Sequence, residues 1–170
     1  MSADQQVDAL VARVADALRA RGASMATAES CTGGLVAAAC TSLAGSSDWF
    51  ERGVVTYSNA AKTELLGVPA DLIARHGAVS AEVARAMAAG ALARSPAAFT
   101  VAITGIAGPG GGTIDKPVGT VWLATAAREG NAESTLLNAP GDRDEVRRRS
   151  AVRALELLLV RVEATPLARR

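Results

Sequence analysis

Histidine and cysteine, the side chains that most often bind transition metals, are nearly absent from this sequence. It contains one histidine, His76, and two cysteines, Cys31 and Cys40, which fall in one short segment. Neither the lone histidine nor the cysteine spacing matches a zinc site, and the two cysteines provide no disulfide framework. We therefore expect no metal site and assign no cofactor.

The sequence also lacks long apolar runs and a large excess of either charge. No apolar stretch approaches the ~20 residues of a membrane-spanning helix, and the acidic, amphipathic start of the chain is unlike a signal peptide. The formal net charge of +1 argues against an extensive nucleic-acid-binding surface. We expect a cytoplasmic protein that binds neither membranes nor nucleic acid.

Lysine is scarce as well. Lys62 and Lys116 are the only lysines among 18 basic residues, and the others are all arginine. Arginine stays protonated in proteins, whereas a lysine can lose its proton when it is buried. A lysine kept in so arginine-rich a chain is therefore a candidate general base, with chance retention as the alternative.

Helical and strand patterns alternate along the chain. Helices are expected over residues 4–21, after Gly33, over 60–66, from Pro69 to Gly77, over 80–94 and from Asp142 onward. Strands are expected over residues 24–29, 51–58, 99–104, 119–127 and 132–138, the last two forming a hairpin. This order predicts a single domain over residues 1–170, an α/β fold with a three-layer α/β/α sandwich and a mixed sheet.

A serine stands where an expected strand meets an expected helix, in the segment Thr27-Ala-Glu-Ser-Cys-Thr-Gly-Gly34. Unpaired N–H groups at a helix N-terminus can stabilise an oxyanion, which makes Ser30 a candidate nucleophile. Capping of the helix by Ser30 or Thr32 is the simpler interpretation of the same spacing. Cys31 competes as the nucleophile, but no second histidine is present to pair with it.

Tyr57 and Lys62 form a second candidate group, in the segment Val55-Thr-Tyr-Ser-Asn-Ala-Ala-Lys62. Because Tyr57 ends an expected strand and Lys62 begins an expected helix, both side chains can face the same edge of the sheet. A neutral lysine can accept a proton from a serine hydroxyl, and a tyrosine can relay or return it. A surface lysine and a half-buried tyrosine are the alternative interpretation.

Two further segments suit an anionic ligand. The glycine-dense loop from Gly105 to Gly112 follows a strand and can cradle a phosphate with its N–H groups, or it is simply a flexible loop. Arg143 and Arg147 lie one turn apart at the start of the last helix, a spacing suited to a phosphate or carboxylate.

Taken together and in order, the sequence motifs resemble the C-terminal domain of the competence/damage-inducible protein CinA. The resemblance runs from about Val7 to Leu159 and rests on the motifs TAESCTGG, VTYSNxAK, HGAVS, TGIAGPGGG, KPVGTVW and GDRxxVR. That family includes stand-alone nicotinamide-nucleotide amidohydrolases, also called NMN deamidases.

The resemblance implies hydrolysis of nicotinamide mononucleotide to nicotinate mononucleotide and ammonia, in pyridine-nucleotide salvage, by a metal-free serine–lysine–tyrosine mechanism. Carried over residue by residue, it indicates Ser30, Lys62 and Tyr57 as catalytic, and it places Thr104 and Gly105 near the active-site loop. We expect Cys31, Thr32 and Gly33 to bind the oxyanion, and Arg143 and Arg147 to bind the phosphate. A homo-oligomer is compatible with the family. The alternatives are a nucleotide-binding module without catalysis, a serine–lysine amidase for another amide or peptide, and an accessory role in DNA uptake.

Overall fold

Five strands form one mixed sheet in the computed structural model, which describes residues 1–167. They are β1 (Met25–Glu29), β2 (Phe50–Val55), β3 (Phe99–Gly105), β4 (Thr120–Ala127) and β5 (Glu133–Asn138). Their order across the sheet is β2-β1-β3-β4-β5. Strand β1 is parallel to β2 and β3, whereas β4 is antiparallel to β3 and β5, so the predicted mixed sheet is confirmed. The last three residues of the predicted domain lie outside the described residues.

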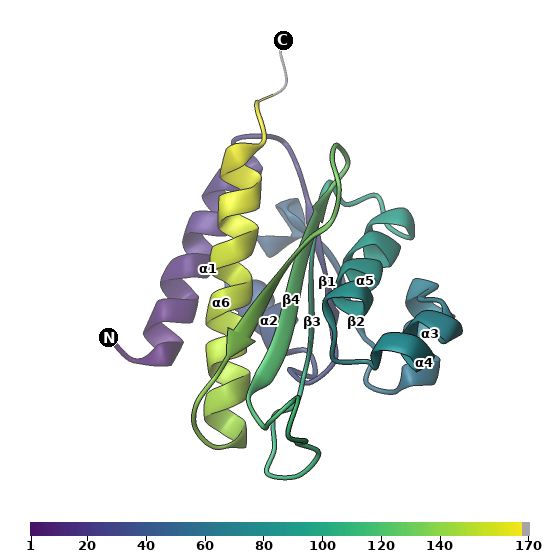
Figure 1. Cartoon of the computed structure of the whole chain (residues 1–170). Coiled ribbons are helices and arrows are strands. Elements are labelled where there is room, and N and C mark those ends of the chain that lie inside the picture. Colours follow the sequence, from purple (N-terminus) through teal and green to yellow (C-terminus); the bar gives the residue numbers. More distant parts are fainter. Residues whose placement is uncertain (168–170) are drawn as a thin grey trace.

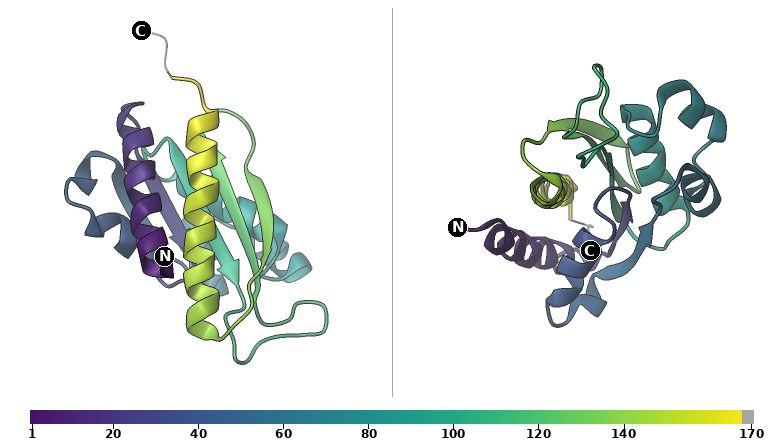
Figure 2. Two further views of the ribbon diagram at one scale, coloured as in Figure 1. Left: turned by 90° about the vertical axis from the view of Figure 1, so that its left-hand side faces the viewer. Right: turned by 90° about the horizontal axis from the view of Figure 1, so that it is seen from below.

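Helices cover both faces of the sheet (Figures 1 and 2). One face carries α1 (Ala3–Arg19), α2 (Leu35–Ser42) and α6 (Arg143–Ala164). The other carries α3 (Asn59–Leu66), α4 (Ala70–His76) and α5 (Ala81–Ala93). A short 3₁₀ turn (Ser46–Asp48) precedes β2. The predicted three-layer arrangement is therefore confirmed.

Each face of the sheet has its own apolar core. Under α1 and α6 the core is built from large side chains, among them the fully buried Leu18, Leu155 and Leu158. Burial of one such side chain contributes about 1.5–3 kcal/mol. Under α5 the sheet presents mainly alanines, which lets that helix pack closely on the strands. The amphipathic spacing read from the sequence thus corresponds to real buried faces.

The connections between the strands open a crevice at the carboxyl ends of the parallel strands. The chain leaves β1 through α2 on one face and leaves β2 through α3, α4 and α5 on the other. The strand order reverses between β1 and β3, so a crevice opens at the carboxyl ends of these two parallel strands. Crevices of this kind are the usual ligand sites of open α/β sheets. The right-hand view of Figure 2 looks up at this edge from below.

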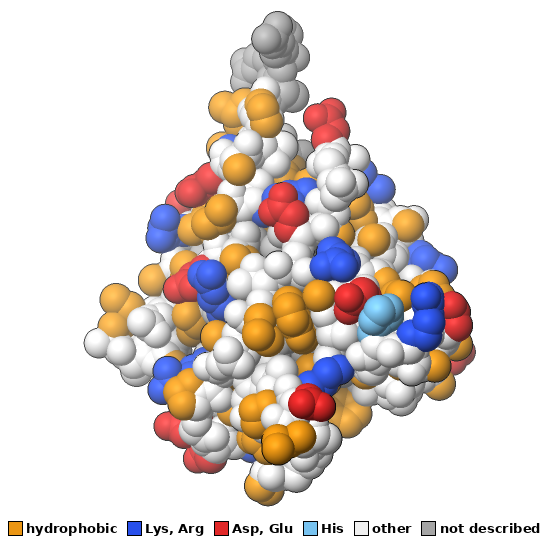
Figure 3. Space-filling view, in the orientation of Figure 1, with side chains coloured by type: hydrophobic (Ala, Val, Ile, Leu, Met, Phe, Trp, Pro, Cys, Tyr) orange, Lys and Arg blue, Asp and Glu red, His pale blue; other side chains and the backbone are white. Residues whose placement is uncertain are grey.

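The face of the molecule in Figure 3 carries no large patch of one charge. On the side seen in Figure 3, basic, acidic and hydrophobic side chains are interspersed over the helices and the sheet. None of the helices in residues 1–167 has the length and apolar character needed to cross a membrane.

Candidate active site

A buried lysine and a serine meet at the carboxyl edge of the sheet. Ser30 follows β1, and Lys62 lies in the first turn of α3, where Ser58 caps the helix by accepting from the Ala61 N–H. The Lys62 Nζ atom lies 3.0 Å from the Ser30 Oγ atom. Lys62 is 1% exposed and Ser30 is 7% exposed. The two candidates from separate sequence motifs therefore form one hydrogen-bonded pair.

The surroundings of Lys62 favour its neutral form. Burial lowers the pKa of the Lys62 ammonium group below its usual range, and no carboxylate among the described residues forms an ion pair with it. The Nζ atom also lies 2.9 Å from the Thr56 carbonyl oxygen and 3.3 Å from that of Tyr57. A neutral amine has two N–H bonds and one lone pair. With the two carbonyls accepting the N–H groups, the lone pair is left to face Ser30.

The segment that follows Ser30 is a tight turn rather than the start of a helix. Helix α2 begins at Leu35, its N-cap is Gly34, and no side chain caps it from that position. Capping by Ser30 or Thr32 is thus wrong as an interpretation. Instead the buried Glu29 carboxylate accepts the N–H groups of Val36 and Ala37, each at 3.0 Å. The N-terminus of this helix is therefore occupied by a carboxylate of the chain itself, and it does not provide the predicted oxyanion site.

Within residues 30–33, the peptide N–H groups that remain for an oxyanion are those of Cys31 and Thr32. The Ser30 N–H donates to the Ile103 carbonyl at 2.9 Å, and the Gly33 N–H donates to the Ser30 carbonyl at 3.0 Å. The expectation that Gly33 donates to an oxyanion therefore does not fit this geometry. Within the described part of the chain, the N–H groups of Cys31 and Thr32 have no acceptor. Cys31 also lines the cleft beside Ser30.

Cys31 itself is poorly suited to act as a nucleophile. Its side chain is buried, and burial raises the pKa of the thiol to about 11. The thiolate, which is the reactive form, is therefore scarce near neutral pH. The Cys31 Sγ atom would lie 3.1 Å from a Cβ atom placed on Gly105. Cys31 thus acts as a small packing residue between the turn of residues 30–34 and the end of β3.

Tyr57 lies at the open side of the cleft, and its backbone and its side chain contact different residues. Its carbonyl oxygen accepts from Lys62 Nζ at 3.3 Å and lies 3.5 Å from the Ser30 Oγ atom. Its side chain is 63% exposed, and the phenol oxygen accepts a hydrogen bond from Arg143 Nη2 at 3.2 Å. The strand predicted over 51–58 ends at Val55, because Thr56 and Tyr57 turn their carbonyl groups toward Lys62.

The glycine-dense loop and the segment before α5 close the cleft, which has a volume of about 280 Å³. Thr104, at the end of β3, is buried and donates to the Ala78 carbonyl at 2.9 Å, which joins the strand to the HGAVS segment. The Arg143 Nη1 atom donates to the Gly108 carbonyl at 2.7 Å. Lys116 Nζ donates to the His76 carbonyl at 2.8 Å. The loop is therefore bound to its neighbours on both sides of the cleft.

Gly105 and Gly108 are positions where glycine is required. A Cβ atom on Gly105 would lie 2.7 Å from Val121 Cγ2, and one on Gly108 would lie 2.5 Å from Val118 Cγ1. Gly108 also has a positive φ of 82°, a conformation that side-chain-bearing residues rarely adopt. The glycines thus let the loop fold back tightly over the cleft.

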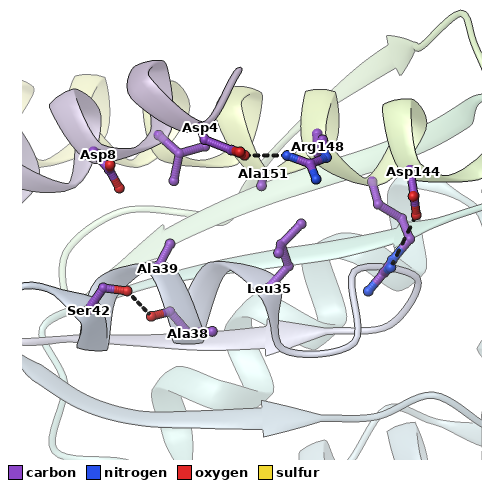
Figure 4. A pocket seen from close by; sticks show the side chains of 11 residues that line it. Asp4, Asp8, Leu35, Ala38, Ala39, Ser42, Asp144, Arg148 and Ala151 are labelled. Carbon is purple, nitrogen blue, oxygen red and sulfur yellow. Dashed lines mark hydrogen bonds and ion pairs between the residues drawn. The ribbon is translucent and has the colours of Figure 1, made fainter. Parts of the chain in front are cut away.

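Arg143 and Arg147, predicted as a pair, face different cavities. Arg143 lines the cleft with Ser30 and Lys62. Arg147 lines a separate pocket between α1, α2 and α6 that contains neither of those residues (Figure 4). In that view the dashed line at Asp144 is its 4.0 Å contact with Arg147 Nη1. Only Arg143 is therefore placed to contact a ligand in the cleft.

Glu29 and Asn59 have site positions for which the sequence reasoning assigned no role. Glu29 caps α2, and Asn59 lines the cleft next to Lys62. The role of Glu29 had a signal in the sequence. It is an acid at the end of an expected strand, one residue before a candidate nucleophile, and a buried acid at such a position needs hydrogen-bond donors. The structure describes no cluster of three or more metal-ligating side chains in residues 1–167.

Comparison with known proteins places this geometry in a family. The sequence model of the CinA C-terminal domain family matches residues 7–162 of this chain. The chain belongs to the CinA C-terminal domain family. Its sequence is 52% identical over 155 residues to the nicotinamide-nucleotide amidohydrolase PncC of Escherichia coli strain K12, which covers 91% of this chain and 94% of that protein.

Two further relatives of the CinA domain agree with this assignment. A CinA-like protein of Mycolicibacterium vanbaalenii is 60% identical over 137 residues, which is 81% of this chain and 32% of that longer protein. The crystal structure of the competence/damage inducible protein CihA from Agrobacterium tumefaciens matches with a TM-score of 0.88 and 47% identity, covering 93% of this chain and 96% of that one. The family and the fold expected from the motifs are both confirmed.

Proposed function

We propose that this CinA domain hydrolyses the carboxamide of nicotinamide mononucleotide to nicotinate mononucleotide and ammonia, a reaction of pyridine-nucleotide salvage. The observation that carries the proposal is the buried pair of Lys62 and Ser30, 3.0 Å apart in a cleft that also holds Arg143. The pair supplies a nucleophile and a base, and the guanidinium supplies a cation for the phosphate. The relative named nicotinamide-nucleotide amidohydrolase, 52% identical, supports the substrate.

The first half of the reaction forms an ester on Ser30. Neutral Lys62 accepts the Ser30 hydroxyl proton while Oγ attacks the carboxamide carbon, and the resulting oxyanion is held by the N–H groups of Cys31 and Thr32. The C–N bond then breaks, and ammonia leaves with a proton returned from the Lys62 ammonium group. In the second half, Lys62 takes a proton from water, which attacks the ester and releases nicotinate mononucleotide. Ser30 regains its proton from Lys62.

Tyr57 is proposed to assist the leaving group from the open side of the cleft. Its phenol oxygen accepts a hydrogen bond from Arg143, so its own proton is free to be donated toward the substrate. The same guanidinium has further N–H groups available for the phosphate, because it uses two of its five donors on described residues of the chain. Tyr57 and Arg143 thus form one hydrogen-bonded unit at the mouth of the cleft.

Incubation with nicotinamide mononucleotide tests the proposal directly. We expect equimolar release of ammonia and nicotinate mononucleotide from the purified protein, measured by coupled ammonia assay and by chromatography. Nicotinamide riboside, which lacks the phosphate, should react with a higher KM. Binding of the nucleotide without ammonia release would contradict the proposal and favour a nucleotide-binding module.

Arg143→Ala should raise the KM for nicotinamide mononucleotide by roughly 10- to 100-fold, because a charge-assisted hydrogen bond contributes about 1.5–3 kcal/mol. Steady-state kinetics with both substrates provide the measurement. The matched control is Arg149→Ala on the same helix, whose side chain faces a groove outside the cleft. For the riboside, KM should change little, and an equal loss with both substrates would show that Arg143 does not bind the phosphate.

The activity should fall as the pH is lowered through the depressed pKa of Lys62. The neutral amine is the base, and protonation removes its lone pair, so kcat/KM is expected to rise with pH and then reach a plateau. A profile of kcat/KM against pH for the mononucleotide and for the riboside gives the measurement. The same rising limb with both substrates assigns the titration to the enzyme rather than to the substrate phosphate. A flat profile would contradict a lysine base.

A further inference from the structure

Arg147 extends from α6 to the backbone of the turn formed by residues 30–34, instead of to the cleft. Its Nε atom donates to the Cys31 carbonyl, and its Nη2 atom donates to the Thr32 carbonyl, each at 3.2 Å. These residues are separated by more than a hundred positions in sequence. A planar guanidinium that donates two parallel hydrogen bonds fixes the two acceptors relative to each other. Arg147 therefore defines the geometry of this turn from outside it.

The bond to the Cys31 carbonyl acts on the peptide that carries the Thr32 N–H, one of the two oxyanion donors. The bond to the Thr32 carbonyl acts on the next peptide, whose Gly33 N–H donates to the Ser30 carbonyl. In a trans peptide the C=O and N–H bonds point in opposite directions. Arg147 holds the Cys31 carbonyl on the α6 side, so the Thr32 N–H of the same peptide points away from α6. The neighbouring Cys31 N–H is oriented in the same way by the bond between the Gly33 N–H and the Ser30 carbonyl. The turn thus presents two free N–H groups whose directions are set by bonds on the far side of each peptide.

The surroundings of the guanidinium support a fixed position. Arg147 packs over Gly33, where a Cβ atom would lie 3.7 Å from Nη2. Its ionic contact with Asp144 is long, at 4.0 Å, and Asp144 is largely exposed, so the ion pair alone would hold it weakly. The two backbone carbonyls are its closest described partners. On the opposite end of the turn, Glu29 anchors α2, which leaves residues 30–34 held from both sides.

We propose that Arg147 is a positioning residue for the oxyanion formed during amide hydrolysis. It orients the Thr32 N–H directly, and the Cys31 N–H through the bond between the Gly33 N–H and the Ser30 carbonyl. The inference rests on the proposed function. It replaces the expectation that Arg147 binds the phosphate, and the two roles differ in kinetics. A phosphate ligand stabilises both bound substrate and transition state and affects KM, whereas an oxyanion-positioning group acts on the transition state and affects kcat.

The test compares Arg147→Ala and Arg147→Lys with the Arg149→Ala control, using ammonia release from nicotinamide mononucleotide. We expect Arg147→Ala to lower kcat about 10- to 100-fold while KM stays within about twofold. Arg147→Lys should recover only part of kcat, because one ammonium group cannot reproduce the two parallel bonds of the guanidinium. The Lys variant also keeps the test valid if the Ala variant folds poorly. A rise in KM with unchanged kcat would overturn the proposal in favour of phosphate binding.

Amide hydrogen exchange gives a second readout that does not depend on activity. The amides of Gly33 and Leu35, which donate to the Ser30 and Thr32 carbonyls, should exchange faster in Arg147→Ala than in the wild type, with β3 and α5 unchanged. If the wild-type protein releases no ammonia, the proposed function fails, whereas faster exchange confined to the turn would still support the positioning role. Unchanged exchange in that turn would overturn it.

Discussion

Ser30→Ala is expected to lower kcat by roughly 10⁵- to 10⁶-fold, since loss of the nucleophile in serine hydrolases has effects of this size. The fold should survive, because Oγ contacts only Lys62 and the Tyr57 carbonyl in the structure. Loss of one hydrogen bond costs about 0.5–1.5 kcal/mol, which corresponds to a shift in Tm of a few °C for a chain of this size. Ammonia release and thermal unfolding measure the two effects separately.

Cys31→Ala is the matched control for the nucleophile. Its thiol has a pKa raised to about 11 and is buried, so removal of Sγ should leave most of the activity and cost stability only through lost packing. The reverse pattern, an active Ser30→Ala and an inactive Cys31→Ala, would identify the thiol as the nucleophile. An acyl-enzyme trapped by rapid quenching and located by mass spectrometry on Ser30 would identify the ester directly.

Lys62→Arg should lower kcat by about 10²- to 10⁴-fold, the range in which general bases contribute. Arginine keeps the positive charge but cannot become neutral near physiological pH, so it cannot accept the Ser30 proton. If Lys62 instead attracted the substrate by its charge alone, the arginine variant would retain most of the rate. Comparison of the kcat values of wild type, Lys62→Arg and Lys62→Met distinguishes the two roles.

Lys62→Met is the folding control for this position. Lys62 is 1% exposed, so a larger, permanently charged arginine can disturb the packing around it. Methionine has a similar length and carries no charge, so Lys62→Met should stay folded and inactive. Its melting temperature should fall by several °C, because the Thr56 and Tyr57 carbonyls lose the Lys62 N–H donors at a cost of about 1–3 kcal/mol. Lys116→Arg should keep full activity, because Lys116 only donates to the His76 carbonyl, which arginine can also do. A fully active Lys62→Met would show that no base is required at this position.

The local elements and the two members of the Ser30–Lys62 pair were predictable as candidates from the sequence alone. Apolar spacing in Val14 and Leu18, the strand FTVAIT and the acidic cap Asp142 each depend on neighbours a few residues away, and the corresponding elements α1, β3 and α6 are present. The scarcity of lysine singled out Lys62 as a candidate base, and the motif around Ser30 singled out a candidate nucleophile. Local chemistry determines these features because propensity, capping and amphipathicity act within one or two turns.

The directions of the site side chains were decided only by the tertiary structure. Arg143 and Arg147 are equivalent by spacing, yet Arg143 faces the cleft and Arg147 donates to the Cys31 and Thr32 carbonyls. Glu29, not the substrate, occupies the N-terminus of α2, and Tyr57 contacts Lys62 through its carbonyl and Arg143 through its phenol oxygen.

Each of these contacts except the local one between Tyr57 and Lys62 joins segments brought together by the sheet order or by the packing of α2 and α6. Sequence spacing says which residues share a helix face, but not which cavity that face meets. Hydrogen-bond partners distant in the chain are selected by the packed fold, because a buried polar group must find a donor or acceptor wherever the fold provides one.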